Sequence, residues 1–216
     1  MVTFTNRQVE VGPLALAGEL ALPENATALV MFVHGSGSSR FSPRHREVAA
    51  VFQRRGMATL LFDLLSEAEA CDRHKVFDIA LLARRVEQAV DWVAQQPQTA
   101  RMRIGLFGAS TGAAAALVAA VARPGRVLAV VSRGGRPDLA TDWLPRVDVP
   151  TLLIVGSADP DVLAINRAAF RLLHCIRRIE VVPGATHLFE EPAALQSVAE
   201  LAADWFESYL RYGRPA

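Results

Sequence analysis

The residue that most directly suggests chemistry is Ser110, at the centre of a Gly-x-Ser-x-Gly sequence. An apolar run that begins at Arg103 ends in this motif, and an Ala-rich segment with helical character follows at once. A serine at the apex of such a strand-to-helix turn has a strained backbone, and its hydroxyl points out toward a substrate. Unpaired N–H groups and the dipole at the start of the helix would stabilise a developing oxyanion. The stretch therefore predicts a nucleophile elbow.

Two further candidates, Asp159 and His187, each follow the end of another apolar run. Asp159 comes after the run that ends at Gly156, and His187 comes after the run that ends at Val182. Such runs alternate with helical spacings along most of the chain. The pattern predicts an α/β fold, a mostly parallel twisted sheet with helices on both faces and a ligand site at the carboxyl ends of the strands. Ser110, Asp159 and His187 would then meet at that end of the sheet.

The elements that must position these residues can be placed by range. Strands are predicted over 3–11 and 14–22, as an N-terminal antiparallel hairpin, and over 28–33, 58–62, 127–131, 150–156 and 178–182, besides the strand before Ser110. Helices are predicted over 44–55, from 76 up to Pro97, after Ser110, over 162–173, and from near Pro192 onward. The segment 64–73 is expected to be irregular, and 132–138 is expected to be a loop.

Length and composition limit the class of protein. The chain has 216 residues, which fits a single domain over 1–216 without a separate cap domain. Its 23 basic and 22 acidic residues give a net charge of +1 without a basic block, so we expect no nucleic-acid partner. Neither a signal peptide nor a membrane-spanning stretch is visible, which favours a cytoplasmic protein without membrane contact. Cys71 and Cys175 form no motif, so reduced thiols are favoured over a disulfide.

Four short motifs occur in a fixed order along the chain. They are His34-Gly35-Ser36-Gly37, Gly108-Ala109-Ser110-Thr111-Gly112, Gly156-Ser157-Ala158-Asp159-Pro160-Asp161-Val162 and Gly184-Ala185-Thr186-His187. In this order they resemble the oxyanion segment, the elbow, the acid loop and the histidine loop of the α/β-hydrolase superfamily, most closely its small dienelactone-hydrolase-like members. The resemblance implies that Ser110 is the nucleophile, that His187 is the general base and then acid, and that Asp159 orients the imidazole.

The resemblance also implies where an oxyanion would be bound. The donors would be the backbone N–H of Thr111 and one from Gly35 or Ser36. One departure matters, because dienelactone hydrolases proper use a cysteine at the position of Ser110. Their substrate is therefore not implied, and the chain is expected to behave as an ordinary serine esterase.

Other residues compete for the acid and base roles. Asp161, Asp138 and Asp142 compete with Asp159, although turn formation or helix capping explains them more simply. The other histidines are His34, expected to hold the oxyanion loop, His174, near a helix end, and His45 and His74, expected in exposed segments.

Arg133 and Arg136 follow a predicted strand at the same end of the sheet. We hypothesise that one of them recognises a carboxylate on the substrate. The alternative is a solvated loop arginine or a salt bridge to Asp138 or Asp142.

Three classes of function remain. The first is a serine hydrolase for small carboxylic esters, thioesters or lactones, with a small-molecule substrate, no cofactor and no metal. The second is a dinucleotide-binding oxidoreductase that uses the Gly-rich turn 105–112. It is disfavoured because the next strand ends in Val131-Ser132-Arg133 instead of an acidic residue. The third is a non-catalytic binding protein on the same fold. The sequence leaves open whether the protein is a monomer or a homodimer.

Overall fold

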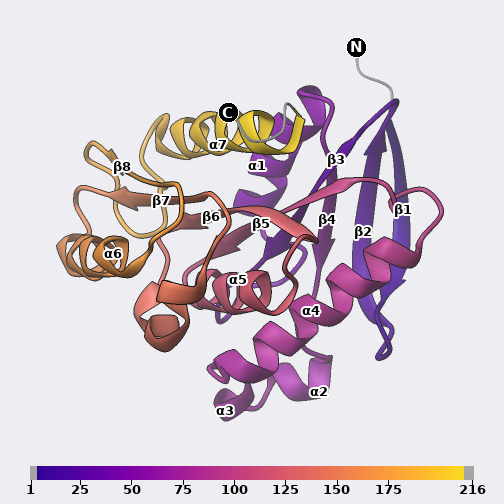
Figure 1. The fold of residues 1–216 in the computed structure, drawn as a ribbon, viewed down its shortest axis with the longest axis horizontal. Coiled ribbons are helices and arrows are strands. Elements are labelled where there is room, and N and C mark those ends of the chain that lie inside the picture. The colour runs from indigo at the N-terminus through magenta and orange to yellow at the C-terminus, as the bar shows by residue number, and fades with distance from the viewer. Residues whose placement is uncertain (1–3, 212–216) are drawn as a thin grey trace.

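An eight-stranded sheet forms the centre of the molecule in the computed structural model, which describes residues 4–211 (Figure 1). The strand order is β1-β2-β4-β3-β5-β6-β7-β8, and every pair from β4 to β8 is parallel. The strands are β1 (Phe4–Val11), β2 (Leu16–Pro23), β3 (Ala28–Val33), β4 (Ala58–Phe62), β5 (Arg103–Ala109), β6 (Val127–Arg133), β7 (Thr151–Gly156) and β8 (Arg177–Val182). The predicted α/β architecture is confirmed.

The N-terminal hairpin is antiparallel, as predicted. Its strands β1 and β2 pair from Phe4 opposite Pro23 to Val11 opposite Leu16, and β2 then pairs antiparallel with β4. Thr3, where the first strand was predicted to begin, lies outside the described residues. The hairpin therefore extends one edge of the parallel sheet.

Helices cover both faces of the sheet, as Figure 1 shows. One face carries α1 (Pro43–Arg54) and α7 (Ala194–Phe206), which continues into a π-helical turn, η2 (Glu207–Arg211). The other face carries α4 (Ile79–Gln95), α5 (Thr111–Ala122), the 3-10 segment η1 (Pro137–Arg146) and α6 (Pro160–Leu172). Each layer buries a separate apolar cluster, and the strands between them are buried on both sides. Burial on both faces explains why β3 is an uninterrupted apolar run and why β4 is apolar except for the buried Thr59.

The segment 64–73 is not irregular throughout, so this prediction was wrong. It contains α2 (Glu67–Ala70) and leads into α3 (Arg73–Val76). Ser66 and Glu69 form a reciprocal capping box for α2, and the Asp72 carboxylate caps α3. Side-chain caps of this kind satisfy the free N–H groups of a helix start, which makes even a four-residue helix possible. Val76, predicted to begin the long helix, belongs to α3, because Asp78 caps α4.

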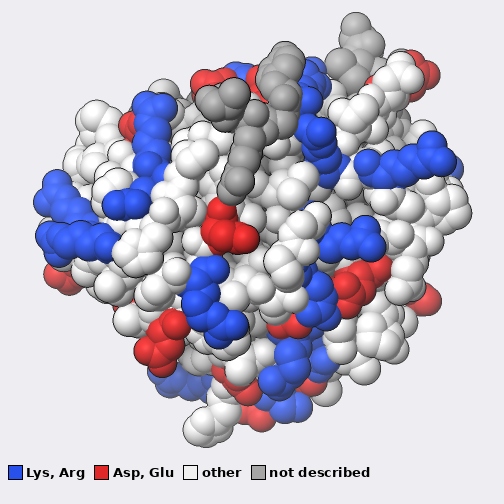
Figure 2. Space-filling view, in the orientation of Figure 1, with Lys and Arg blue, Asp and Glu red and all other residues white. Residues whose placement is uncertain are grey.

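The visible surface carries charges of both signs, mixed over the helices (Figure 2). Several of them pair, for example Arg123 with Glu87 and Asp91. No helix within residues 4–211 combines the length and the apolar character needed to cross a membrane.

Candidate active site

Ser110 lies in the turn between β5 and α5 with a strained backbone. Its φ is +50° and its ψ is −124°, a conformation that costs a non-glycine residue on the order of 1–3 kcal/mol. The flanking glycines make this turn possible. A Cβ on Gly108 would lie 2.5 Å from the Cα of Ala113, and one on Gly112 would overlap the carbonyl oxygen of Val33. The motif therefore folds as a nucleophile elbow because strand and helix approach too closely for side chains at these two positions.

The backbone of Ser110 is anchored to the end of β6. Its N–H donates to the carbonyl of Arg133 at 3.3 Å, and its own carbonyl accepts the N–H of Arg136 at 3.0 Å and that of Ala113 at 3.1 Å. These bonds hold the strained turn in place. The side chain of Ser110 is half-buried and does not cap α5, so its hydroxyl is not occupied by the helix start.

The predicted oxyanion loop lies directly beside Ser110. A Cβ on Gly35 would lie 2.9 Å from the carbonyl oxygen of Ala109 and 3.0 Å from the Cβ of Ser110. The backbone N–H of Ser36 donates to the Thr111 hydroxyl at 3.0 Å. That bond occupies one of the three predicted donors. Two of the backbone N–H groups are free of such bonds. Thr111, the first residue of α5, and Gly35 donate to no acceptor among the described residues, bonds within α5 itself aside. They are the better candidates for binding an oxyanion.

His34 holds the oxyanion loop, as its position predicted. The N–H of Leu64 donates to Nε2 at 3.1 Å, so Nε2 carries no proton. The proton is therefore on Nδ1, which lies 3.0 Å from the carbonyl of Gly35 and donates to it. Burial lowers the pKa of His34, which keeps the ring neutral. Asp63 adds a second tie, since its carboxylate accepts the Arg40 N–H at 2.8 Å and pairs with the Arg40 guanidinium.

The structure brings Asp159 and His187 together. Their carboxylate Oδ2 and imidazole Nδ1 are 2.8 Å apart, and the Asp159 side chain is 15% exposed while that of His187 is 39% exposed. Asp159 occupies the cap position of α6 but makes no capping bond, because its carboxylate is turned to the histidine. The bond fixes Nδ1 as the protonated nitrogen in the neutral ring and leaves Nε2 free to accept a proton.

The acid and histidine loops are joined to each other by backbone bonds. Ala158 N–H donates to the Ala185 carbonyl at 2.9 Å, and Gly184 N–H donates to the Ser157 hydroxyl at 2.7 Å. His187 also lies near the elbow, because a Cβ on Gly134, just after β6, would be 3.6 Å from its Cε1. Among the described residues, no hydrogen bond links the Ser110 hydroxyl to His187. Such bonds often tighten only when substrate is bound.

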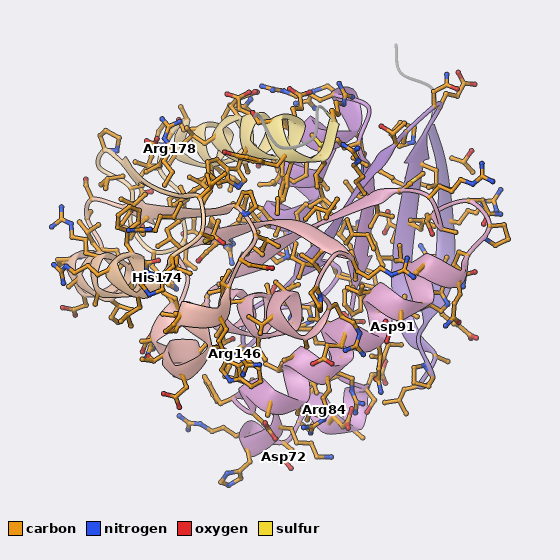
Figure 3. The ribbon with its side chains drawn as sticks, in the orientation of Figure 1. Asp72, Arg84, Asp91, Arg146, His174 and Arg178 are labelled. Carbon is orange, nitrogen blue, oxygen red and sulfur yellow. The ribbon has the colours of Figure 1, made fainter. Side chains whose placement is uncertain are left out.

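The competing acids and bases lie elsewhere. Asp161 and Asp142 are exposed, and Asp138 pairs with Arg136. His174 is exposed just after the end of α6, as Figure 3 shows, and His74 is exposed on α3. His45 was predicted to be exposed, which was wrong. It is 2% exposed because the first turn of α1 packs its ring against Phe32 and Phe107.

The two arginines differ sharply. Arg136 donates two hydrogen bonds to the carboxylate of Asp138, at 2.8 and 2.7 Å. Arg133 was predicted to lie in a loop, which was wrong. It is the last residue of β6, and it is 7% exposed. The ladder continues through this residue because it pairs with Ala109 and Ile154 of the neighbouring strands.

A cavity of about 510 Å³ adjoins the oxyanion loop on the side of the hairpin. Its walls come from the turn 14–17, from 34–41 and from 63–67, together with a few side chains of α2 to α4. None of Ser110, Asp159 and His187 lines it, although Gly35 and Ser36 do. We therefore define the site by the side-chain geometry at the elbow, with this cavity as a neighbouring space. No three His, Cys, Asp or Glu side chains in the described part of the chain form a group that could hold a metal ion.

Comparison with known proteins gives solved structures of the same fold. The crystal structure of dienelactone hydrolase from Anabaena variabilis is 53% identical, with a TM-score of 0.93 over 97% of this chain and 99% of that chain. Est1E from Butyrivibrio proteoclasticus is 15% identical, with a TM-score of 0.78 over 93% of this chain and 97% of that one, which shows a shared fold alone.

Curated relatives of this chain are longer proteins. Two proteins of Mycobacterium tuberculosis, each named "Putative phosphoribosyl transferase", are 55% identical over 203 residues. The match covers 94% of this chain and 46% of those proteins, so the chain spans about half of their length. Their name therefore describes proteins about twice as long.

A protein-family model also matches the sequence. Residues 16–212, from the second strand to beyond the last described helix, match the Dienelactone hydrolase family, and both this family and the α/β-hydrolase fold support a hydrolase. As its four motifs implied, the chain belongs to the dienelactone hydrolase family.

Proposed function

We propose that this chain is a serine hydrolase that cleaves small carboxylic esters, thioesters or lactones through an acyl-enzyme. The observation that carries the proposal is the 2.8 Å bond between Asp159 and His187, beside a strained elbow that presents Ser110. The active-site order Ser, Asp, His and the two unoccupied backbone donors support the same conclusion.

The proposed reaction has two halves. His187 takes the proton of the Ser110 hydroxyl through Nε2 while the oxygen attacks the carbonyl carbon of the ester. The resulting oxyanion accepts hydrogen bonds from the N–H groups of Thr111 and Gly35. His187 then gives its proton to the leaving alcohol, and the acyl group stays on Ser110. In the second half His187 activates a water in the same way, which releases the acid and restores the serine. Asp159 keeps the imidazole oriented and stabilises its positive charge throughout.

The dinucleotide-binding alternative fits the structure poorly. Glycines of such a turn leave room for a pyrophosphate. Here a Cβ on Gly105 would lie 2.6 Å from the ring of Phe206, and Gly108 faces Ala113. The space is therefore filled by the protein itself. The name of the mycobacterial relatives suggests a phosphoribosyl transferase, but that activity does not account for the paired Asp159 and His187.

The proposal is tested by labelling with a fluorophosphonate, followed by intact-mass spectrometry of the parent protein and of Ser110→Ala. We expect one adduct on the parent protein and none on the variant. Turnover of a chromogenic acetate ester should follow the same pattern. A folded parent protein that takes up no label and turns over no ester would favour the third class, a non-catalytic binding protein.

A further inference from the structure

Asn166 is a fully buried polar residue on α6. It is 0% exposed, and Ala169 is the other buried residue of this 13-residue helix. Its side-chain oxygen Oδ1 has no hydrogen-bond partner in the part of the chain that the structure describes. An apolar side chain of similar size would fill the position without leaving a polar atom unsatisfied. Residues that break a packing rule in this way are often found where a function requires them.

The side-chain amide of Asn166 donates two hydrogen bonds. Its nitrogen Nδ2 lies 2.9 Å from the carbonyl oxygen of Gly135 and 2.8 Å from that of Val162. The bond to Val162 stays within α6, one turn back along the helix. The bond to Gly135 crosses to the turn after β6, residues 133–136, which is 31 positions away in the sequence. The bond to Gly135 is therefore the one that fixes two parts of the fold against each other.

The turn 133–136 binds the backbone of Ser110 on both sides. The N–H of Ser110 donates to the carbonyl of Arg133, and the carbonyl of Ser110 accepts the N–H of Arg136. Gly135 lies between these two partners and is tightly packed, because a Cβ on it would be 2.7 Å from a side chain of α5. A shift of Gly135 would therefore disturb both backbone bonds of the strained elbow.

The turn 133–136 also adjoins the acid and the histidine. Asp159 directly precedes the first residue of α6, and its carbonyl accepts an N–H of the first turn of that helix. Asn166 lies about two turns further along the same helix. A Cβ on Gly134 would be 3.2 Å from the carbonyl oxygen of His187. Asn166 thus ties the turn that anchors the nucleophile to the helix that begins at the acid.

We propose that Asn166 is a positioning residue, whose amide holds the turn 133–136 against α6 and so aligns Ser110 with the imidazole. This inference rests on the proposed function. Because Asn166 is wholly buried, it reaches neither the substrate nor the reacting atoms, and it acts through the backbone of the turn. Loss of its Nδ2 donor should leave substrate binding unchanged and slow the attack by Ser110, since the serine oxygen would be aligned for reaction less often.

Two substitutions test the bond to Gly135. Asn166→Leu keeps a similar size and removes the donor. Asn166→Ser can donate to the Val162 carbonyl, as serine does in helices, but is too short to reach Gly135. We expect both variants to lower kcat for the chromogenic acetate ester about tenfold with KM nearly unchanged, and to slow fluorophosphonate labelling by the same factor. Ala169→Gly, the control, weakens the same helix without removing a side-chain donor and should keep the parent values.

A merely structural role would give a different result. Urea unfolding of the three variants shows which of them are less stable, and each is assayed under conditions in which it is folded. A variant of Asn166 that unfolds more easily but turns over ester as the parent protein does would overturn the proposal. An equal loss of kcat in Ala169→Gly would also overturn it, because the loss would then follow the stability of the helix. If Asn166→Leu does not fold, Asn166→Ser carries the same test.

Hydrogen exchange distinguishes failure of this inference from failure of the proposed function. The N–H groups of Ser110 and Arg136 form the two bonds between the elbow and the turn, so both should exchange faster in the Asn166 variants than in the parent protein. Faster exchange, in a protein that takes up no label and hydrolyses no ester, would support the role of Asn166 in holding the turn and reject the hydrolase. Unchanged exchange together with the parent kcat would reject that role and support the hydrolase.

Discussion

The two halves of the candidate site are held in different ways. The nucleophile region, residues 33–36 with 108–112, is fixed by close packing in addition to the backbone bonds of Ser110, since neither Gly35 nor Gly112 leaves room for a Cβ. The acid–histidine region, residues 156–159 with 184–187, is held mainly by hydrogen bonds between two loops at the surface. Gly184 has open space around it, whereas Gly156 faces the Ala185 carbonyl. Substitutions in the nucleophile region should therefore reduce stability, and those in the acid–histidine region should reduce mainly activity.

The largest effect is expected in the acid–histidine region. Asp159→Asn should lower kcat for a chromogenic ester by about 10⁴-fold, because an amide no longer holds the imidazole with Nε2 free or stabilises its charge. The free energy of unfolding, measured with urea, should change little. Asp161→Asn, two positions along on the exposed first turn of α6, is the matched control. Equal losses in the two variants would contradict the assignment of the acid.

Two glycine substitutions, one in each region, test the expected difference in stability. The Cβ of Gly112→Ala would overlap the Val33 carbonyl oxygen, and we expect a loss of about 3 kcal/mol in the free energy of unfolding. Gly184→Ala adds its Cβ in open space, and only its φ of +71° opposes the substitution. That variant should lose about 1 kcal/mol. Urea unfolding of both proteins makes the measurement. If Gly184→Ala proved the more damaging, the contrast between the two regions would be wrong.

The same contrast explains what the sequence could predict. β3 and β4 were predicted to the residue because a strand buried on both faces is apolar along nearly its whole length. The order of Ser110, Asp159 and His187 follows from the strands that precede them. Their pairing does not, because Asp159 and Asp161 follow the same strand and differ only in which one faces the other loop.

Two of the errors concern polar residues placed in buried positions. Arg133 reads as a loop residue because a charge normally ends an apolar run, yet its backbone still pairs on both sides and its side chain enters the interior. His45 was predicted to be exposed because a polar side chain normally lies at the surface, yet its ring is buried. The bond between Ser36 and Thr111 joins residues 75 positions apart, so no local pattern announces it. A run of apolar residues reports burial, whereas a partner distant in sequence is visible only in three dimensions.

His45, whose ring packs against Phe32 and Phe107 in the strands that lead into the nucleophile region, allows a test of stability by pH. Burial lowers its pKa from 6.5 to about 3, with smaller contributions from Arg133, His34 and Arg44. Between these two values the unfolded chain binds more protons than the folded one, so stability falls as the pH falls below about 6.5. The contribution of His45 to this loss is about 2 kcal/mol by pH 5.

Urea unfolding at pH 8 and pH 5 measures this loss. His45→Phe should show a smaller difference between the two pH values than the parent protein does, because a phenyl ring packs on Phe32 and Phe107 without titrating. His74→Gln, on the exposed helix α3, should keep the full difference. An unchanged difference in His45→Phe would mean that the ring becomes protonated without unfolding the protein.

The smallest effect tests how the oxyanion loop is placed. The Thr111 hydroxyl accepts the Ser36 N–H and so ties this loop to the start of α5. Thr111→Val keeps the shape of the side chain and removes the acceptor. We expect kcat to fall about tenfold, less than the loss of an oxyanion donor itself, with KM nearly unchanged, because only the transition state uses the loop's N–H groups. Thr111→Ser restores the acceptor and should restore kcat. A rise of kcat in Thr111→Val would instead show that the freed Ser36 N–H binds the oxyanion. The hydrogen bond between Ser36 and Thr111 would then lower the activity of the parent protein by occupying a donor.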